Sequence, residues 1–342
     1  MKPLPPDTPE QALITQYEGS LLVVRAYAGT GKTTTLVKYA HNNLNSRILY
    51  IAYNRGIRDE AREKFPANVD CKTSHQLAYA TIGRSYQHKL TGNLRLTDIA
   101  QAVDTKNWTI AKDILDTLNA FMSSADFRIL YTHFARADTG KVLTTKQTQY
   151  ISQVVEGAEF VWSKMTNPED PFPTVHDCYL KQYQLGMPNL SRRYTTILFD
   201  EAQDSNPVTS SIVLQQHCKV ILVGDRHQQI YRFRGANNAL DSKDLAGADQ
   251  LYLTHSWRFG RNVAIVANAL LELKGETLPV VGRGASDQVV MFLPQDVGHR
   301  TVIHRTVMGV IETALAATAK GKKVYWVGGI DAYQINELQD IY

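Results

Sequence analysis

The sequence predicts an α/β fold in which helices cover both faces of a parallel sheet. Two observations support this prediction: the apolar runs are short, and segments of helical periodicity separate them. The runs expected to form strands are 21–25, 48–53, 196–199, 220–223, 289–293, 301–304 and 323–327. Helices are expected at 34–43, 56–65 and 263–273, and a glycine-rich loop at 281–286.

The stretch from residue 85 to residue 189 has a different pattern. Segments 97–120 and 146–164 show helical periodicity, and no run nearby suits a buried strand. A turn-rich segment, 167–173, interrupts the helical pattern. We therefore predict a mostly helical insertion within the sheet domain.

The composition sets broad limits on the class of protein. The 342 residues include three cysteines without metal-ligand spacing, so neither a disulfide framework nor a zinc site is expected. No apolar run approaches the ~18 residues that a membrane span needs, and no signal peptide is recognisable. We expect a cytoplasmic protein with no membrane partner, associated with the nucleoid if its source is prokaryotic. The net charge of +4 permits nucleic-acid binding without requiring it.

A glycine-rich loop directly follows the first expected strand. Its residues are Ala28, Gly29, Thr30, Gly31, Lys32, Thr33 and Thr34. Backbone N–H groups of such a loop cradle the β-phosphate, while Lys32 reaches the β- and γ-phosphates and the Thr33 hydroxyl ligates Mg²⁺. The usual pattern begins with glycine, whereas this chain has Ala26, whose small side chain still permits the tight turn. The loop predicts binding of a nucleoside triphosphate with Mg²⁺.

Two further expected strands end in polar residues. Run 196–199 leads into Asp200 and Glu201. We assign Asp200 to Mg²⁺ and Glu201 to the role of general base for the attacking water. Run 220–223 precedes Gln228, whose amide is placed to sense the γ-phosphate. Two acids after a strand are more often a solvated helix start, but beside a phosphate loop they indicate a hydrolytic site.

Aromatic and cationic residues follow Gln228 closely. Tyr231, Phe233 and Arg234 offer surfaces for unpaired bases and phosphates. Taken alone, the segment is somewhat better explained as two core aromatics and a surface arginine.

An ordered series of seven motifs runs through the chain. The motifs lie at 8–11, 28–34, 52–54, 73–75, 200–204, 224–236 and 253–259. Their order and content resemble superfamily 1 DNA helicases of the UvrD/Rep/PcrA type. The resemblance is closer to the F-box DNA helicase and its prokaryotic and viral relatives, because of residues 174–181, 225–231 and 257–260.

The resemblance implies three parts. Residues 1–84 and 190–261 correspond to a RecA-like ATPase domain of the P-loop NTPase class, usually called 1A. Residues 85–189 correspond to the helical insertion called 1B, and residues 262–342 to the start of a second RecA-like domain, 2A. Two late motifs of the family, one with a second γ-phosphate arginine, are not found before Tyr342. The chain is therefore expected to bind ATP, to bind single strands weakly, to hydrolyse ATP poorly and to show no sustained unwinding of DNA.

For the ATP site, the resemblance implies three further residues. Gln11 corresponds to the glutamine that reads the adenine edge, and Trp257 to an aromatic that stacks on the adenine ring. Arg258 corresponds to an arginine that reaches the γ-phosphate and stabilises transition-state charge. The expected catalytic set is Lys32, Glu201, Gln228 and Arg258.

For single-stranded DNA, the resemblance implies contacts from Tyr53, Asn54, Thr73 and His75. It also implies that the segment with Tyr231, Phe233 and Arg234 couples the nucleotide cleft to stacked bases. A structural role is the alternative for two of these residues, because His75 is as well explained by a structural hydrogen bond and Thr73 by a helix cap.

The implied activity is ATP-dependent DNA unwinding, with translocation 3′→5′ along single-stranded DNA and engagement of duplex junctions. One alternative is a non-motor, ATP-gated single-strand-binding or regulatory protein, although the intact Lys32, Asp200 and Glu201 count against it. A second alternative is a P-loop enzyme acting on small molecules, such as a kinase. Such an enzyme has no use for Tyr53 or Trp257, and oligonucleotide binding would separate it from a helicase.

Overall fold

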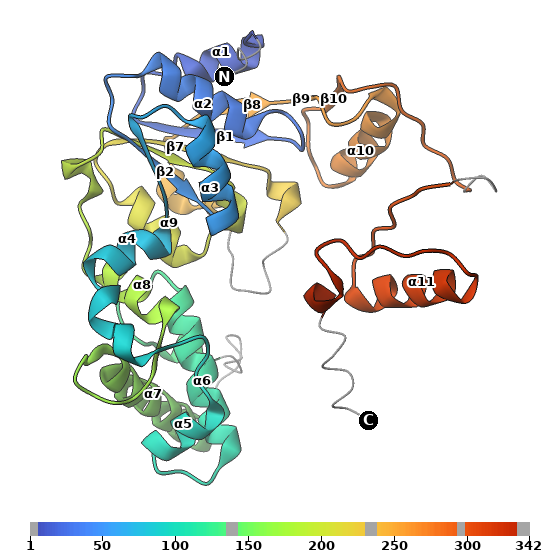
Figure 1. The fold of residues 1–342 in the computed structure, drawn as a ribbon. Helices are drawn as coiled ribbons and strands as arrows, with labels where there is room; N and C mark the ends of the chain where they lie inside the picture. Colours follow the sequence, from blue (N-terminus) through green and yellow to red (C-terminus); the bar gives the residue numbers. More distant parts are fainter. Residues whose placement is uncertain (1–5, 135–142, 230–237, 293–297, 334–342) are drawn as a thin grey trace. The chain divides into compact units, whose positions relative to one another are not determined.

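The computed structural model describes residues 6–134, 143–229, 238–292 and 298–333. The chain groups into two compact units, Met1–Gln288 and Val289–Tyr342. The first unit contains the sheet and the helices around it (Figure 1). These units divide the chain later than the boundary expected at residue 262, and the domain limits given above remain a prediction.

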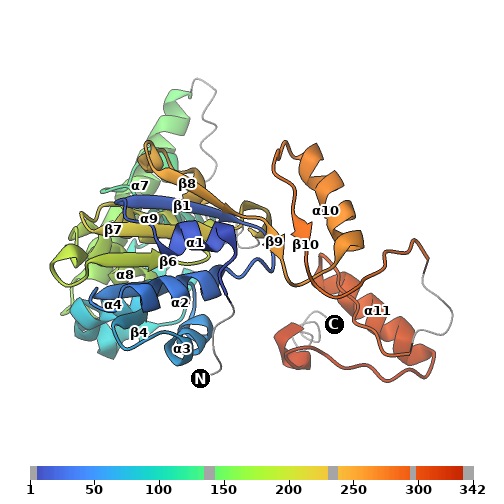
Figure 2. The same ribbon diagram turned by 90° about the horizontal axis from the view of Figure 1, so that it is seen from above.

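A six-stranded sheet forms the centre of the first unit. In sheet order, its strands are β3 (Val69–Thr73), β2 (Ile48–Ala52), β6 (Thr196–Phe199), β7 (Lys219–Gly224), β1 (Leu21–Ala26) and β8 (Asp249–Leu253). Every neighbouring pair is parallel, and Figure 2 shows β8, β1, β7 and β6 side by side. The carboxyl ends of the strands therefore share one edge, which is where ligands bind in open α/β sheets.

Helices cover both faces of this sheet, which confirms the α/β prediction. The helices on one face are α1 (Pro9–Thr15), α2 (Lys32–Asn42) and α3 (Arg55–Lys64). Those on the other are α4 (Ser74–Thr81), α8 (His176–Leu185) and α9 (Pro207–Leu214). The strands supply both cores, because successive side chains point to opposite faces. In β2, Tyr50 belongs to the first core, whereas Leu49 and Ile51 belong to the second.

The stretch between α4 and α8 is mainly helical, as its periodicity predicts. Its elements are η1 (Gly83–Lys89), β4 (Leu90–Thr91), α5 (Leu96–Ala102), α6 (Trp108–Ser123), η2 (Tyr131–His133), α7 (Thr145–Thr166) and β5 (Thr174–Val175). The two short strands β4 and β5 pair in parallel. The helices α5, α6 and α7 enclose an apolar core of their own, and Figure 1 shows them gathered beyond α8.

A buried lysine on α8 fastens this helical part to the rest of the unit. The Lys181 side chain has no exposed surface, and its ammonium donates to the Ser124 carbonyl at 2.9 Å and to the Gln184 side chain at 2.9 Å. It also donates to the Asp126 carbonyl and lies 4.5 Å from the Phe121 ring centre. The buried ammonium thus has its hydrogen-bond partners in the carbonyls that follow α6 and in a neighbouring side chain of α8.

The remaining elements are short turns and two longer helices. They comprise η3 (Leu190–Arg192), η4 (Ala202–Asp204), η5 (Arg226–Gln228), η7 (Ala239–Asp241), η8 (Lys243–Leu245), β9 (His255–Ser256), α10 (Arg261–Leu273) and β10 (Val281–Gly282) in the first unit. The second unit contains α11 (Val307–Ala319) and η9 (Ile330–Tyr333). Residues 281–286, expected to be a loop, begin with β10, which pairs with β9.

Three predicted strands are wrong. Within the described residues, 289–292, 301–304 and 323–327 contain no strand, and many of their apolar side chains are exposed, Met291 to 93% and Ile303 to 88%. A strand needs a neighbour that pairs with its N–H and C=O groups, and these runs have none in the described part of the chain. Apolar content alone does not form a strand.

One predicted helix is interrupted, and two strands of the six-stranded sheet were missed. The helix expected over 97–120 is split into α5 and α6, because Asp104 takes a left-handed conformation at φ 48° and the Asn107 side chain caps α6. The missed strands, β3 and β8, are the two edges of the sheet. Edge strands bury fewer side chains, so they lack the continuous apolar run that identifies the inner strands.

Candidate active site

The glycine-rich loop connects β1 to the first turn of α2. Gly29 and Gly31 have φ angles of 74° and 81°, a left-handed conformation that favours glycine. A β-carbon at Gly29 would also overlap the Arg258 side chain. The loop leads directly into α2, which begins at Lys32. The N–H groups at the start of this helix provide a site for an anion.

Two charged or polar pairs join this loop to the end of β6. Lys32 Nζ lies 3.3 Å from Glu201 Oε2, and Thr33 Oγ1 donates to Asp200 Oδ2 at 3.0 Å. Glu201 has a φ of 51°, a strained conformation for a residue other than glycine. The structure thus brings together the four residues that the sequence assigned to phosphate, metal and base.

Asp200 is fully buried and held by three donors. Its carboxylate accepts hydrogen bonds from Thr33 Oγ1, from Tyr50 Oη at 2.8 Å and from the Glu201 N–H at 2.9 Å. Burial and the neighbouring Glu201 charge nevertheless raise the pKa of Asp200, against the effect of the hydroxyl donors and Lys32. The site therefore holds two adjacent acids whose ionisation is opposed by burial and by their mutual repulsion.

This donor set fits Mg²⁺. Asp200 and Thr33 offer adjacent carboxylate and hydroxyl oxygens, the hard ligands that Mg²⁺ prefers. No cluster of three or more metal-ligating side chains occurs among the described residues. Mg²⁺ usually takes one or two protein ligands and completes its shell with water and phosphate oxygens.

A glutamine that sequence reasoning passed over links the two strand ends. Gln203 Nε2 donates to Glu201 Oε2 at 2.7 Å, while Gln203 Oε1 accepts from the Asp225 N–H at 3.0 Å. Gln228 in turn donates to Asp225 Oδ2 at 2.6 Å. The expected base and the expected γ-phosphate sensor therefore belong to one hydrogen-bond network. The signal that could have identified Gln203 is its position two residues after Glu201, at the end of a buried strand.

Gln11 lies against the phosphate loop. Its Oε1 accepts from the Thr8 N–H at 3.2 Å and from Lys38 Nζ at 3.1 Å, so the capping box of α1 fixes the amide. Its Nε2 would lie 3.2 Å from a β-carbon at Gly31. The residue expected to read adenine is therefore positioned beside the loop.

The segment after β8 also reaches the loop. The Trp257 N–H donates to the Gly29 carbonyl at 2.9 Å, and 56% of the Trp257 side chain is exposed. Glu10 anchors this segment to α1, since its carboxylate accepts from the Thr254 N–H at 2.9 Å. Burial alone would raise the pKa of Glu10, but the hydrogen bonds from Thr254 and the neighbouring His255 lower it. An exposed ring beside a phosphate loop is suited to stacking on a base.

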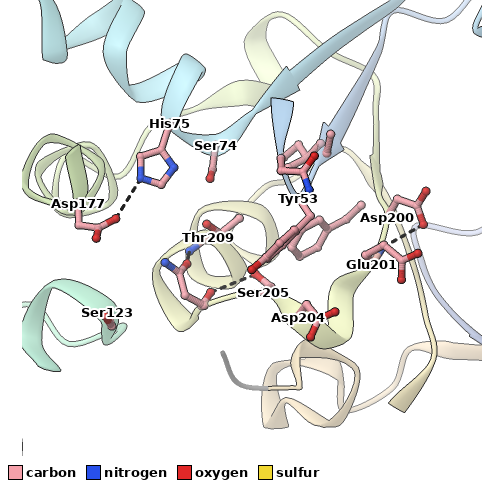
Figure 3. A pocket seen from close by; sticks show the side chains of 15 residues that line it. Tyr53, Ser74, His75, Ser123, Asp177, Asp200, Glu201, Asp204, Ser205 and Thr209 are labelled. Carbon is pink, nitrogen blue, oxygen red and sulfur yellow. Dashed lines mark hydrogen bonds and ion pairs between the residues drawn. The ribbon is translucent and has the colours of Figure 1, made fainter. Parts of the chain in front are cut away.

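Three of the expected DNA-binding residues line one cavity of about 360 Å³ (Figure 3). Tyr53, Asn54 and His75 follow β2 and β3, and Asp200 and Glu201 line the same cavity. Thr73 does not line it.

Two of these residues have structural contacts in addition. His75 Nε2 pairs with Asp177 Oδ1 at 3.0 Å. The Thr73 hydroxyl accepts from the Gln76 N–H and caps α4, which is the alternative role foreseen for it. The remaining candidates, Tyr231, Phe233 and Arg234, lie outside the described residues.

Taken together, the fold and the site define a class of protein. A loop between β1 and α2 that is built to receive phosphate, with carboxylates at the end of a nearby parallel strand, is the arrangement of a P-loop NTPase with a RecA-like sheet. Residues 7–244 match the family described as the UvrD/REP helicase N-terminal domain, and the chain belongs to that family.

Individual relatives agree with this assignment. The chain is 34% identical to "F-box DNA helicase 1" of Gallus gallus, over 95% of this chain and 33% of the relative. It is 36% identical to "F-box DNA helicase protein 1" of Schizosaccharomyces pombe, over 80% and 34%. It is 27% identical to "ATP-dependent DNA helicase PcrA" of Leuconostoc citreum, over 81% and 41%. The chain thus spans about a third of the length of the first two relatives.

No described helix combines the length and the apolar character needed to cross a bilayer.

Proposed function

We propose that the chain is the ATP-binding part of a DNA helicase that moves 3′→5′ along single-stranded DNA and engages duplex junctions. The observation that carries the proposal is the pairing of Lys32 with Glu201 and of Thr33 with Asp200. The names of the relatives support DNA as the substrate. The proposal keeps the cytoplasmic location expected from the sequence, which in a prokaryote would be at the nucleoid with the DNA substrate.

In this mechanism each residue of the site has a separate role in binding or hydrolysing ATP. Lys32, which pairs with Glu201 here, would bind the β- and γ-phosphates and leave the Glu201 carboxylate to accept a proton from the attacking water. Asp200 and Thr33 would hold Mg²⁺, which when bound neutralises charge on the phosphate oxygens. Gln228 and Arg258 would contact the γ-phosphate, while Gln11 and Trp257 would bind the adenine.

The DNA-binding candidates share a cavity with the hydrolytic acids. Tyr53 and His75 line the cavity that also reaches Asp200 and Glu201. A change at the acids on nucleotide binding can therefore alter the contacts available to a single strand, as a shift between two states. This shared cavity supports a coupling of ATP state to DNA affinity.

Nucleotide and DNA binding by matched lysine variants test the proposal. Lys32→Ala should weaken binding of a fluorescent ATP analogue with Mg²⁺ by about 10- to 100-fold, because a charge-assisted hydrogen bond contributes about 1.5–3 kcal/mol. Its affinity for an oligo-dT strand without nucleotide should stay the same. The control is Lys112→Ala, an exposed lysine on α6. Two results would contradict the proposal. One is equal binding of the analogue by both variants, and the other is an affinity of the unmodified chain for oligo-dT that does not change when the analogue is added.

A further inference from the structure

A cluster of four side chains lies beside the phosphate loop and has no role in the mechanism above. Glu276 Oε1 is 2.8 Å from His227 Nε2 and 3.4 Å from an Arg226 guanidinium nitrogen. The Tyr27 ring stacks on the His227 ring, with centres 6.4 Å apart and planes 25° from parallel. We call Tyr27, Arg226, His227 and Glu276 the Glu276 cluster.

The Glu276 cluster joins three segments that are distant in sequence. Tyr27 precedes the phosphate loop, and His227 belongs to the η5 turn. Glu276 follows α10, and the Tyr27 hydroxyl donates to the Leu278 carbonyl at 2.5 Å in that same segment. Tyr27 remains a donor at neutral pH, because burial and then the Glu276 and Asp225 charges raise its pKa to about 12.

The cluster fixes the turn that carries Gln228. Asp225 Oδ1 accepts from the His227 N–H at 2.9 Å, and Asp225 Oδ2 accepts from Gln228 Nε2 at 2.6 Å. His227 and Gln228 thus share one carboxylate as well as one short turn. Because Glu276 holds the His227 ring from the other side, a rotation of the turn that redirects Gln228 must also move or break the His227–Glu276 pair.

The pair is shielded enough to have an energetic effect. The side chains of His227 and Glu276 are 18% and 21% exposed, much less than the surface pairs of the helices, such as Lys112 with Asp116 at 63% and 36%. Exposed ion pairs contribute little, whereas partly buried pairs with good geometry are screened less. The contact between His227 and Glu276 therefore restrains the η5 turn, unlike a pair that is fully exposed to solvent.

We propose that His227 and Glu276 are positioning residues that hold Gln228 toward the terminal phosphate and so set the preference for nucleoside triphosphate over diphosphate. The inference rests on the proposed function, since it requires that nucleotide bind at the phosphate loop. It goes beyond that function in assigning γ-phosphate discrimination to a pair that need not touch the nucleotide. The segment after α10 would then respond to the same phosphate through Glu276.

The test is the ratio of two dissociation constants. For each variant, Kd is measured with Mg²⁺ for ADP and for ATPγS, and the ratio Kd(ADP)/Kd(ATPγS) is compared. Glu276→Gln should lower the ratio about tenfold, with most of the change in ATPγS affinity, because the amide replaces the carboxylate in the charge-assisted hydrogen bond to His227. The matched control is Glu272→Gln, an exposed carboxylate on α10, which should retain the ratio.

A second variant keeps the test decisive. If Glu276→Gln fails to fold, as judged by its thermal unfolding, His227→Gln should lower the ratio instead. A ratio within twofold of the control in the folded variants would overturn the inference, and so would an equal loss of ADP and ATPγS affinity, which indicates a structural role only. An unmodified chain that binds neither nucleotide would refute the proposed function itself.

Discussion

At the scale of single residues, the site trades stability for chemistry. Asp200 is ionisable and fully buried, and Glu201 lies next to it in a left-handed conformation. Each feature costs free energy, because burial disfavours the charged carboxylate and the left-handed region disfavours a side chain. Both costs are expected where a metal ion and a water molecule are to be held.

Asp200→Asn tests the cost of burying this carboxylate through the pH dependence of folding stability. The pKa of Asp200 is raised in the folded state above its ordinary value of 3.8, so the unfolded chain ionises first as the pH rises. Folding stability from this group is therefore highest at acid pH and falls as the pH rises through the folded pKa. We expect the variant to lose this decline and to be at least as stable as the unmodified chain at pH 7 without Mg²⁺. Urea unfolding between pH 4 and pH 8 measures the free energy of unfolding of both chains, with Asp116→Asn, a half-buried carboxylate on α6, as control.

Glu201→Gln separates binding from hydrolysis. The amide keeps an oxygen for Lys32 and for Gln203 but cannot take a proton from water. We expect binding of ATP with Mg²⁺ within a few fold of the unmodified chain, and a single-turnover hydrolysis rate that is lower by about 10²–10⁴. The exposed Glu159→Gln serves as control. Hydrolysis at the control's rate would show that another group is the base.

At the scale of elements, α8 contributes side chains to two separate cores. Tyr179 and Leu180 pack in the core beneath the sheet, whereas Cys178 packs in the core of the helices α5, α6 and α7. Lys181 lies on the same helix and satisfies carbonyls at the end of α6. The helical part is thus attached to the sheet through one shared helix and a buried ammonium.

Lys181→Met should weaken that attachment. The methionine fills a similar volume but leaves the Ser124 and Asp126 carbonyls and the Gln184 amide without their donor. Leaving buried polar groups unsatisfied costs about 1–3 kcal/mol for each group. We expect a loss of several kcal/mol in urea unfolding and faster amide exchange in α6 and α8. Lys112→Met, on the exposed surface of α6, should change stability by less than about 0.5 kcal/mol.

What the sequence predicts depends on whether a feature is local. The phosphate loop is readable because Gly29 and Gly31 must take left-handed angles within one short segment. The inner strands are readable because both of their faces are buried. The edge strands β3 and β8 were missed and three apolar runs were wrongly assigned, because strand formation depends on a partner elsewhere in the chain. Contacts such as that between His227 and Glu276, 49 residues apart, have no local signature at all.

At the scale of the whole molecule, the candidate site draws on nearly the full length of the first unit. Gln11 comes from α1, Lys32 from α2, Glu201 from the end of β6 and Trp257 from the segment after β8. Such a site exists only when the unit has folded, so nucleotide binding and folding of this unit are thermodynamically linked. The second unit, Val289–Tyr342, contributes none of the described site residues.

This linkage predicts where a bound nucleotide protects the chain. ATPγS with Mg²⁺ at 100 times its Kd should stabilise the folded state by about 2.7 kcal/mol and raise Tm by several degrees. Hydrogen–deuterium exchange should slow in 27–34, 200–204, 225–229 and 254–258, the segments that meet at the phosphate loop. Lys32→Ala, with a Kd about 10- to 100-fold higher, should retain only about 0.4–1.4 kcal/mol of this stabilisation at the same concentration and show correspondingly weaker protection. Protection confined to other segments, or equal in the variant, would place the nucleotide away from this loop.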